Sequence, residues 1–169
     1  SNKVIGIDNS VSAYNICKNK GFTVKLHNIE DRLPFNDKSF DVVVASEIIE
    51  HIYDTDKLLQ EFNRILKDNG FLVITTPNLA SLARRLRLLV GISPQIDIGI
   101  INEYGDDLSV GHIRYFTFNT LKKLLKRNNF KTVLSTSDYI TFNKFRSKKL
   151  AKILPTLGFS IVIKAQKTK

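Results

Sequence analysis

The chain lacks the residues and segments on which disulfide-rich and membrane-spanning proteins depend. Its 169 residues include a single cysteine, Cys17, which excludes an intramolecular disulfide and any metal site built from several cysteines. No apolar run approaches the roughly 20 residues that cross a bilayer, so the sequence predicts no membrane-spanning helix. Internal repeats and low-complexity tracts are absent as well. We therefore expect one globular domain over residues 1–169, with the cytoplasm as its compartment.

Positive charge is abundant and unevenly distributed, giving a formal net charge of +10. Acidic residues concentrate between Glu30 and Glu61, whereas basic groups dominate at 84–87, 122–127 and 144–152. A basic face in the second half would attract an anionic surface, and an ordinary solvated lysine-rich surface is the alternative. Because this half has no interleaved aromatic residues and no RNA-binding motif, a nucleic-acid partner is not expected.

Strand-like and helical patterns alternate through the first half of the chain. Apolar runs at 4–8, 22–27, 40–45 and 71–75 predict strands. Between them, Ser10 can cap one helix, and a second helix begins at Asp54 or Thr55. This alternation predicts an α/β fold with a parallel sheet and right-handed crossovers.

Finer features of these helices follow from their sequence. The first helix should turn Ala13, Ile16 and Cys17 inward, which makes Cys17 a small buried thiol and not a nucleophile. Asn69-Gly70 should end the second helix through a left-handed residue.

The second half is less regular. Residues 79–89 form an apolar stripe flanked by arginines, which predicts an amphipathic helix, and the segment 79–115 as a whole is interpreted as a variable insertion or lid. Thr117 should cap a leucine-rich helix. Residues 130–137 and 159–164 predict two closing strands, with a basic helix between them that ends near Pro155.

Several short segments carry a more specific pattern, and their order matters more than any one of them. They are VIGIDNS at 4–10, NIEDRLPF at 28–35, SFDVVV at 39–44, EIIEHI at 47–52, RILK at 64–67 leading to TTPN at 75–78, and GHIRYFT at 111–117. Together they resemble the class I S-adenosylmethionine-dependent methyltransferases, in the branch that includes quinone-biosynthesis enzymes. The resemblance covers essentially the whole chain from Val4 onward.

The resemblance implies a Rossmann-like three-layer sandwich with strand order 3-2-1-4-5-7-6 and an antiparallel last strand. The run ending at Asp8 then corresponds to the family's second strand. The family's first strand and its glycine-rich loop have no counterpart, since none of the eight glycines lies in such a cluster. Either the two strands beside the missing one pair directly, or another chain fills its place, or the missing strand lies in sequence upstream of residue 1. We expect the last, a truncated N-terminus.

The resemblance also implies S-adenosylmethionine as the cofactor and indicates which residues hold it. Ligands of open α/β sheets bind beyond the carboxyl ends of the strands, and Asp8 occupies such an end, where its carboxylate can accept hydrogen bonds from the ribose hydroxyls. Asn28 stands where the family has an acid facing the adenine amino group, and Asn9 and Ile29 would flank the ring; ordinary loop and core packing is the alternative for these three residues. Ser46 and Glu47 would lie at the methionine end.

Catalytic and acceptor-binding residues follow the same logic. His51, just after the family's fourth strand, is the candidate general base for a hydroxyl acceptor, and a structural histidine at a helix start is the alternative. His112, Arg114 and Tyr115 are expected to line the acceptor pocket beneath the lid; the alternative for His112 and Arg114 is that they only fix the turn before the next helix. No metal site is expected.

The sequence therefore predicts an enzyme, a methyltransferase acting on a small-molecule or lipid-linked acceptor. The competing hypothesis is a truncated or degenerate methyltransferase-like module without catalysis that acts as a partner or structural domain. The arginine-flanked helix at 79–89 could contact a membrane or a lipid-linked acceptor. The oligomeric state is open, because a missing central strand would leave room for a neighbouring chain.

Overall fold

A computed structural model describes residues 3–95, 111–142 and 145–168. The chain divides into two compact units, Ser1–Asn36 and Asp37–Lys169. The predicted lid therefore lies partly outside the described residues, since only 79–95 and 111–115 of it are described. No described helix is both long enough and apolar enough to cross a bilayer.

The first unit is a small β–α–β motif. Strand β1 (Gly6–Asp8) pairs in parallel with β2 (Val24–Leu26), and α1 (Val11–Asn19) connects them. The Ser10 hydroxyl accepts a hydrogen bond from the backbone N–H of Ala13 at 3.2 Å, which confirms the predicted helix cap. The predicted inward face is confirmed only in part, because Ala13 and Cys17 are half-buried, whereas Ile16 is 52% exposed and no residue of α1 is fully buried. Two three-residue strands offer too little surface to cover the helix.

The second unit contains a four-stranded sheet. Its strands are β3 (Phe40–Ser46), β4 (Leu66–Pro77), β8 (Ser160–Lys167) and β5 (Phe130–Ser137), in that order across the sheet. Strands β3 and β4 are parallel, and β8 runs antiparallel to both of its neighbours. This order is the predicted 4-5-7-6 part of the family's sheet, so the α/β prediction and its antiparallel last strand are confirmed.

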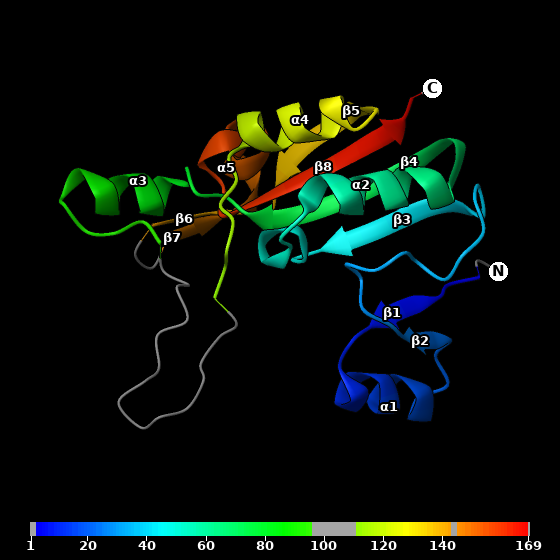
Figure 1. The fold of residues 1–169 in the computed structure, drawn as a ribbon. Helices are drawn as coiled ribbons and strands as arrows, with labels where there is room; N and C mark the ends of the chain where they lie inside the picture. Colours follow the sequence, from blue (N-terminus) through cyan, green and yellow to red (C-terminus); the bar gives the residue numbers. More distant parts are fainter. Residues whose placement is uncertain (1–2, 96–110, 143–144, 169) are drawn as a thin grey trace. The chain divides into compact units, whose positions relative to one another are not determined.

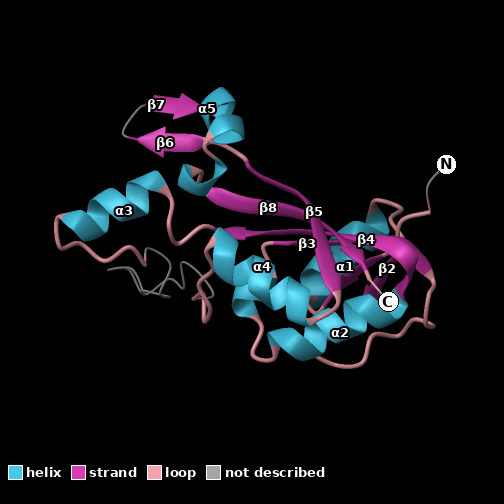
Figure 2. Ribbon diagram, turned by 90° about the horizontal axis from the view of Figure 1, so that it is seen from above, coloured by secondary structure: helices cyan, strands magenta, loops and turns pink. Residues whose placement is uncertain are grey.

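Helices α2 (Thr55–Ile65) and α4 (Phe118–Arg127) lie on the same face of this sheet (Figures 1 and 2). Their apolar stripes pack on the inward side chains of β4 and β8, and together these elements supply much of the buried core: Leu58, Leu59, Phe62, Ile65, Leu121, Leu124, Leu125, Leu72, Ile74, Ile161 and Ile163. Asp54 caps α2 and Thr117 caps α4, as the sequence predicts.

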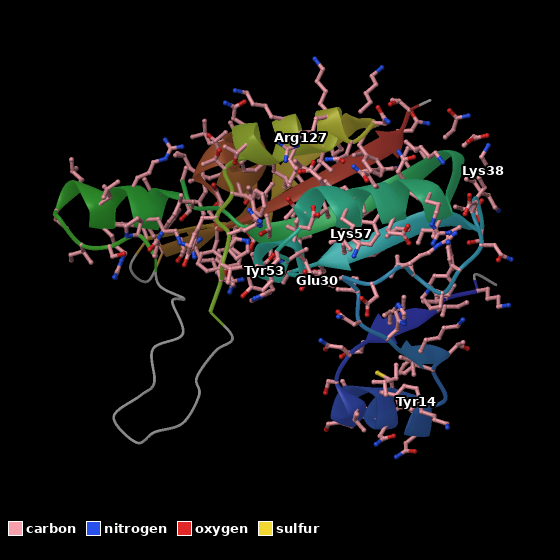
Figure 3. The ribbon with its side chains drawn as sticks, in the orientation of Figure 1. Tyr14, Glu30, Lys38, Tyr53, Lys57 and Arg127 are labelled. Atoms are coloured by element: carbon pink, nitrogen blue, oxygen red, sulfur yellow. The ribbon has the colours of Figure 1, made fainter. Side chains whose placement is uncertain are left out.

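A polar contact fixes the two helices to each other. Asp56 of α2 accepts hydrogen bonds from the guanidinium of Arg127 and from the Asn128 amide, both at the end of α4. These two donors hold the pKa of the Asp56 carboxyl below its ordinary value. Figure 3 shows Arg127 on α4.

The prediction that Asn69-Gly70 ends the second helix is wrong, because α2 ends at Ile65 and both residues lie within β4, where each has its own structural constraint. Asn69 takes the left-handed conformation, with φ of 63°. A β-carbon on Gly70 would lie 2.9 Å from the carbonyl oxygen of Lys67, so only glycine fits this close approach.

The segment between β5 and β8 differs from the prediction. Instead of one basic helix it holds a hairpin of β6 (Ile140–Phe142) and β7 (Phe145–Ser147), then the short α5 (Lys148–Ile153) and a 3-10 turn, η2 (Pro155–Leu157). The hairpin contacts both α5 and α3 (Leu82–Leu89), the amphipathic helix that the sequence predicts.

Candidate functional site

The predicted nucleoside-binding residues lie at one edge of the first unit. Asp8 ends β1, and its backbone oxygen accepts a hydrogen bond from His27 N–H at 2.9 Å, which brings the ends of β1 and β2 together. One Asp8 carboxylate oxygen accepts from the Ser10 N–H at 2.8 Å. A carboxylate has capacity for further donors, so this contact still leaves room for hydroxyl groups.

Asn28, Asn9 and Ile29 lie near the same edge but are less constrained. The Asn28 side-chain oxygen accepts from the Glu30 N–H at 3.1 Å, an Asx turn that orients the loop after β2. Asn9 is exposed and Ile29 is half-buried. These four predicted cofactor residues all belong to the first unit.

Ser46 and Glu47 lie in the second unit, where β3 ends. Glu47 has φ of 52°, the left-handed region, which is strained for a residue with a side chain. The Thr75 hydroxyl donates to the Glu47 carboxylate at 2.8 Å, so it must accept from the Ser46 hydroxyl, also at 2.8 Å. Partial desolvation raises the pKa of the Glu47 carboxyl, the bond from Thr75 opposes this shift, and the nearby negative charge of Glu50 adds to it.

A buried carboxylate follows within one turn. Glu50 lies in the 3-10 turn η1 (Ile49–His51) and is only 1% exposed. Its Oε2 accepts a hydrogen bond from the buried Thr76 hydroxyl at 2.9 Å. Among the described residues, no hydrogen-bond partner faces its Oε1. An acid is rarely buried this deeply without full pairing, which makes Glu50 a candidate functional group.

Two histidines surround this carboxylate. His112 Nε2 lies 4.0 Å from Glu50 Oε1, and the rings of His51 and His112 meet edge to face with centroids 4.8 Å apart. The Nδ1 atom of His51 is buried and has no hydrogen-bond partner within the described part of the chain. The His112 ring is also 6.3 Å from that of Tyr115.

These three residues have the composition of a metal site. One ligand atom from each of Glu50, His51 and His112 lies within 4.8 Å of the other two. Two imidazoles and a carboxylate suit several divalent cations, including manganese, iron and zinc. No metal site is expected from the sequence, and the fit of the donor set is an observation of the structure.

Backbone contacts explain how His112 reaches a partner far away in the sequence. The N–H groups of Ile113 and Arg114 both donate to the Glu50 carbonyl oxygen, at 3.1 and 3.0 Å. The Arg114 guanidinium donates to the carbonyl oxygens of Ile52, at 2.8 Å, and Tyr53. Arg114 therefore anchors this segment on η1, the turn-fixing role that the sequence left open beside acceptor binding.

A groove on the second unit lies next to this anchor. It has a volume of about 460 Å³ and is lined by residues of α2, α4 and the segment between 113 and 116, with Arg114 and Tyr115 among them. His51 and His112 do not line it. Unlike the cluster of Glu50, His51 and His112, the described lining of this groove contains no buried acid or imidazole without a hydrogen-bond partner.

The structure thus brings together His51, His112 and Tyr115 of the predicted residues, and it adds Glu50 and Thr76, which sequence reasoning missed. Glu50 is part of the EIIEHI segment, but nothing in the residue pattern shows that this acid is buried. Thr76 is recognisable only from its contact with Glu50, because it reads as an ordinary strand residue.

The strand order of the second unit and its antiparallel final strand are those of part of a Rossmann-like methyltransferase sheet. Residues 2–135 match the family described as a methyltransferase domain, which is most of the chain. The chain therefore belongs to the S-adenosylmethionine-dependent methyltransferase family, as its sequence motifs predict.

Curated relatives agree over shorter stretches. A protein of Mycobacterium tuberculosis named "Probable S-adenosylmethionine-dependent methyltransferase" is 44% identical over 46 residues, which are 27% of this chain and 17% of that protein. The mitochondrial ubiquinone biosynthesis O-methyltransferase of Rattus norvegicus is 33% identical over 81 residues, or 45% and 24% of the two chains. An uncharacterised protein of Methanocaldococcus jannaschii is 26% identical over 163 residues, 89% of this chain and 64% of its own. The chain thus spans less than two thirds of each relative.

Solved structures show the same fold. An S-adenosylmethionine-dependent methyltransferase of Methanosarcina mazei superposes with a TM-score of 0.70 at 20% identity, covering 98% of this chain and 82% of that one. A second, from Thermotoga maritima, gives a TM-score of 0.68 at 20% identity, covering 97% and 72%.

Proposed function

We propose that this protein transfers a methyl group from S-adenosylmethionine to a hydroxyl of a small-molecule or lipid-linked acceptor. The observation that carries the proposal is the buried Glu50 carboxylate beside His51 and His112, just after β3. Similarity to ubiquinone biosynthesis O-methyltransferases supports an oxygen nucleophile and a small acceptor.

The donor supplies an electrophilic methyl carbon on a sulfonium, so the protein's task is alignment, exclusion of water and removal of one proton. The acceptor oxygen forms a bond to the methyl carbon as the carbon–sulfur bond breaks, and the demethylated donor leaves. We assign the acceptor's proton to His51, whose Nδ1 is buried without a partner among the described residues. Glu50 and His112 would hold the imidazolium that results.

For the cofactor, we propose that the Asp8 carboxylate accepts hydrogen bonds from the ribose hydroxyls and that the Asn28 side-chain oxygen accepts one from the adenine amino group. Asn9 and Ile29 would flank the adenine ring. Ser46 and Glu47 would hold the methionine end. The strained backbone of Glu47 supports this role, because such strain persists where a site needs a particular backbone direction.

A divalent cation is a second way to activate the hydroxyl, and one observation favours it. Glu50 Oε1 is buried, faces two imidazoles and has no hydrogen-bond donor in the described part of the chain. Glu50, His51 and His112 would hold the ion, which would lower the pKa of a bound hydroxyl. If methyl transfer is lost after chelation and restored by manganese or zinc, His51 acts as a metal ligand and not as the general base.

The test separates cofactor binding from chemistry. Calorimetry with S-adenosylmethionine and its demethylated product should give micromolar binding to the wild type and none to Asp8→Ala, while Asp31→Ala, an acid in the same unit, serves as the control. Transfer is then measured as release of the demethylated product in the presence of a panel of hydroxylated small molecules. A folded chain that binds neither compound would favour the degenerate-module hypothesis instead.

A further inference from the structure

Exposed apolar side chains gather on elements that lie together in the second unit. Helix α3 ends in Leu88, Leu89 and Val90, which are 62%, 80% and 69% exposed. The hairpin β6–β7 carries Phe142 and Phe145 as a cross-strand pair, and α5 carries Ile153. These three are 52%, 53% and 72% exposed. We call these six residues the apolar end.

The elements of the apolar end are neighbours and not scattered surface positions. Both α3 and α5 contact β6, and Figures 1 and 2 both show the hairpin near these helices. The base of α3 is fixed, because Arg84 donates to the Asn78 carbonyl oxygen at 3.0 Å and Arg85 donates to the Ala80 carbonyl oxygen at 2.6 Å. These hydrogen bonds hold the start of α3 in place, and the leucines lie at its other end.

The described stretches of chain that carry the apolar end are rich in basic residues. The sequence contains no acidic residue between Leu79 and Gln95, and none between Tyr139 and Lys169. Within these stretches the described basic residues near the apolar end are Arg85, Arg87, Arg146, Lys148, Lys149 and Lys152. Large exposed apolar groups beside basic residues are the composition of an interfacial membrane-binding surface.

We propose that the apolar end, together with the arginines and lysines on the same elements, docks onto the surface of an anionic phospholipid bilayer. The leucines and phenylalanines would enter the boundary between headgroups and acyl chains, and the cations would contact lipid phosphates. This docking does not depend on methyl transfer, although it would bring the protein to a lipid-linked acceptor. A nucleic acid would use the same charge but would leave the aliphatic side chains in water.

The absence of tryptophan from the chain allows a direct test. A Leu89→Trp variant of the full chain is mixed with vesicles of pure phosphatidylcholine and with vesicles that also contain phosphatidylglycerol. We expect a blue shift of its fluorescence only with the anionic vesicles, and no shift for Lys122→Trp on α4. A shift of equal size at both positions, or none at Leu89→Trp, would overturn the proposal.

Charge removal provides the second arm of the test. The triple variant Lys148→Gln, Lys149→Gln, Lys152→Gln should lose vesicle affinity on the order of 100-fold, since each cation at such a surface contributes about fivefold. The matched control Lys122→Gln, Lys123→Gln, Lys126→Gln removes the same charge from α4 and should change affinity by less than about threefold. Equal losses in the two triples would mean nonspecific attraction and would refute a defined docking surface.

Two further outcomes are informative. Wild-type protein that ignores anionic vesicles refutes the proposal and means that another part of the protein or a protein partner covers the apolar end. If the protein binds single-stranded RNA more tightly than vesicles, and the variant with Lys148, Lys149 and Lys152 changed to Gln loses this binding, then the partner is a nucleic acid and not a bilayer. Neither result affects calorimetric binding of S-adenosylmethionine, so failure here is distinguishable from failure of the proposed function.

Discussion

Two regions of the second unit break the usual rules of burial in opposite ways. At η1, a carboxylate is buried with a single hydrogen bond in the described residues, from Thr76. At the apolar end, leucine and phenylalanine side chains lie open to water. Stability alone would favour neither arrangement, because burying an incompletely paired charge is costly and exposing large apolar groups leaves their transfer free energy unused.

Departures from ordinary burial indicate where function lies in a chain of this kind. The remaining core follows the rules, with aliphatic side chains of α2, α4, β4 and β8 buried together. Departures from these rules are therefore informative, and their chemistry differs. A buried acid beside imidazoles is suited to proton transfer or to binding a cation, whereas exposed apolar groups beside basic residues are suited to binding a lipid surface.

The largest effect is expected at the buried cluster. His51→Ala should lower the transfer rate by about 10²- to 10⁴-fold, the usual contribution of a general base, while binding of S-adenosylmethionine is kept. Product release and calorimetry on the same preparation measure the two quantities. His27→Ala, which removes a histidine of the first unit, is the control, and a His51→Ala variant with normal turnover would break the comparison.

The same leucine-to-alanine change should have unequal consequences in core and apolar end. Leu121 is fully buried, so Leu121→Ala should cost about 2–5 kcal/mol of unfolding free energy. Leu89→Ala should change it by less than about 0.5 kcal/mol, because the side chain contributes little packing. Urea denaturation measures both, and a large loss in Leu89→Ala would mean that another segment covers α3.

Removing the donor to the buried acid should be costly. Thr76→Val takes away the hydrogen bond to Glu50 Oε2 and should destabilise the protein by about 1–3 kcal/mol. The neighbouring Thr75→Val is the matched control, since its partner Glu47 reaches solvent and should tolerate the loss. Equal unfolding free energies for Thr76→Val and the wild type would show that Glu50 finds another donor.

The smallest effect concerns Glu47 and depends on pH. Its pKa is raised in the folded state, so folding is favoured while the group is protonated, and this advantage is lost as pH rises from the ordinary value through the raised one. Glu47→Gln keeps an acceptor for Thr75 and should remove this part of the pH dependence, becoming more stable than the wild type above that window. Urea midpoints from mildly acidic to neutral pH measure it, and parallel curves would contradict the shift.

Much of the fold was predictable because local signals and family motifs agree. Polar caps at Ser10, Asp54 and Thr117 begin helices where the structure has them. The hairpin β6–β7 was missed because its strands have three residues each and run into a basic helical pattern. Such short strands are specified by their tertiary neighbours, α3 and α5, and not by local sequence.

The candidate site was predictable only in part, for a related reason. Position after a strand was sufficient to single out His51, and the motif before α4 singled out His112. That the two rings lie 4.8 Å apart depends on backbone bonds to the Glu50 carbonyl oxygen, which no periodicity encodes. The burial of Glu50 is likewise a property of packing.

The most direct test of the central claim, that the buried acid serves chemistry and not stability, is to measure unfolding free energy and transfer rate together for Glu50→Gln. Our account predicts a stability equal to or above that of the wild type, because a buried charge is removed, with a transfer rate lowered by about 100-fold or more. A variant that is less stable yet transfers methyl groups at the normal rate would contradict it.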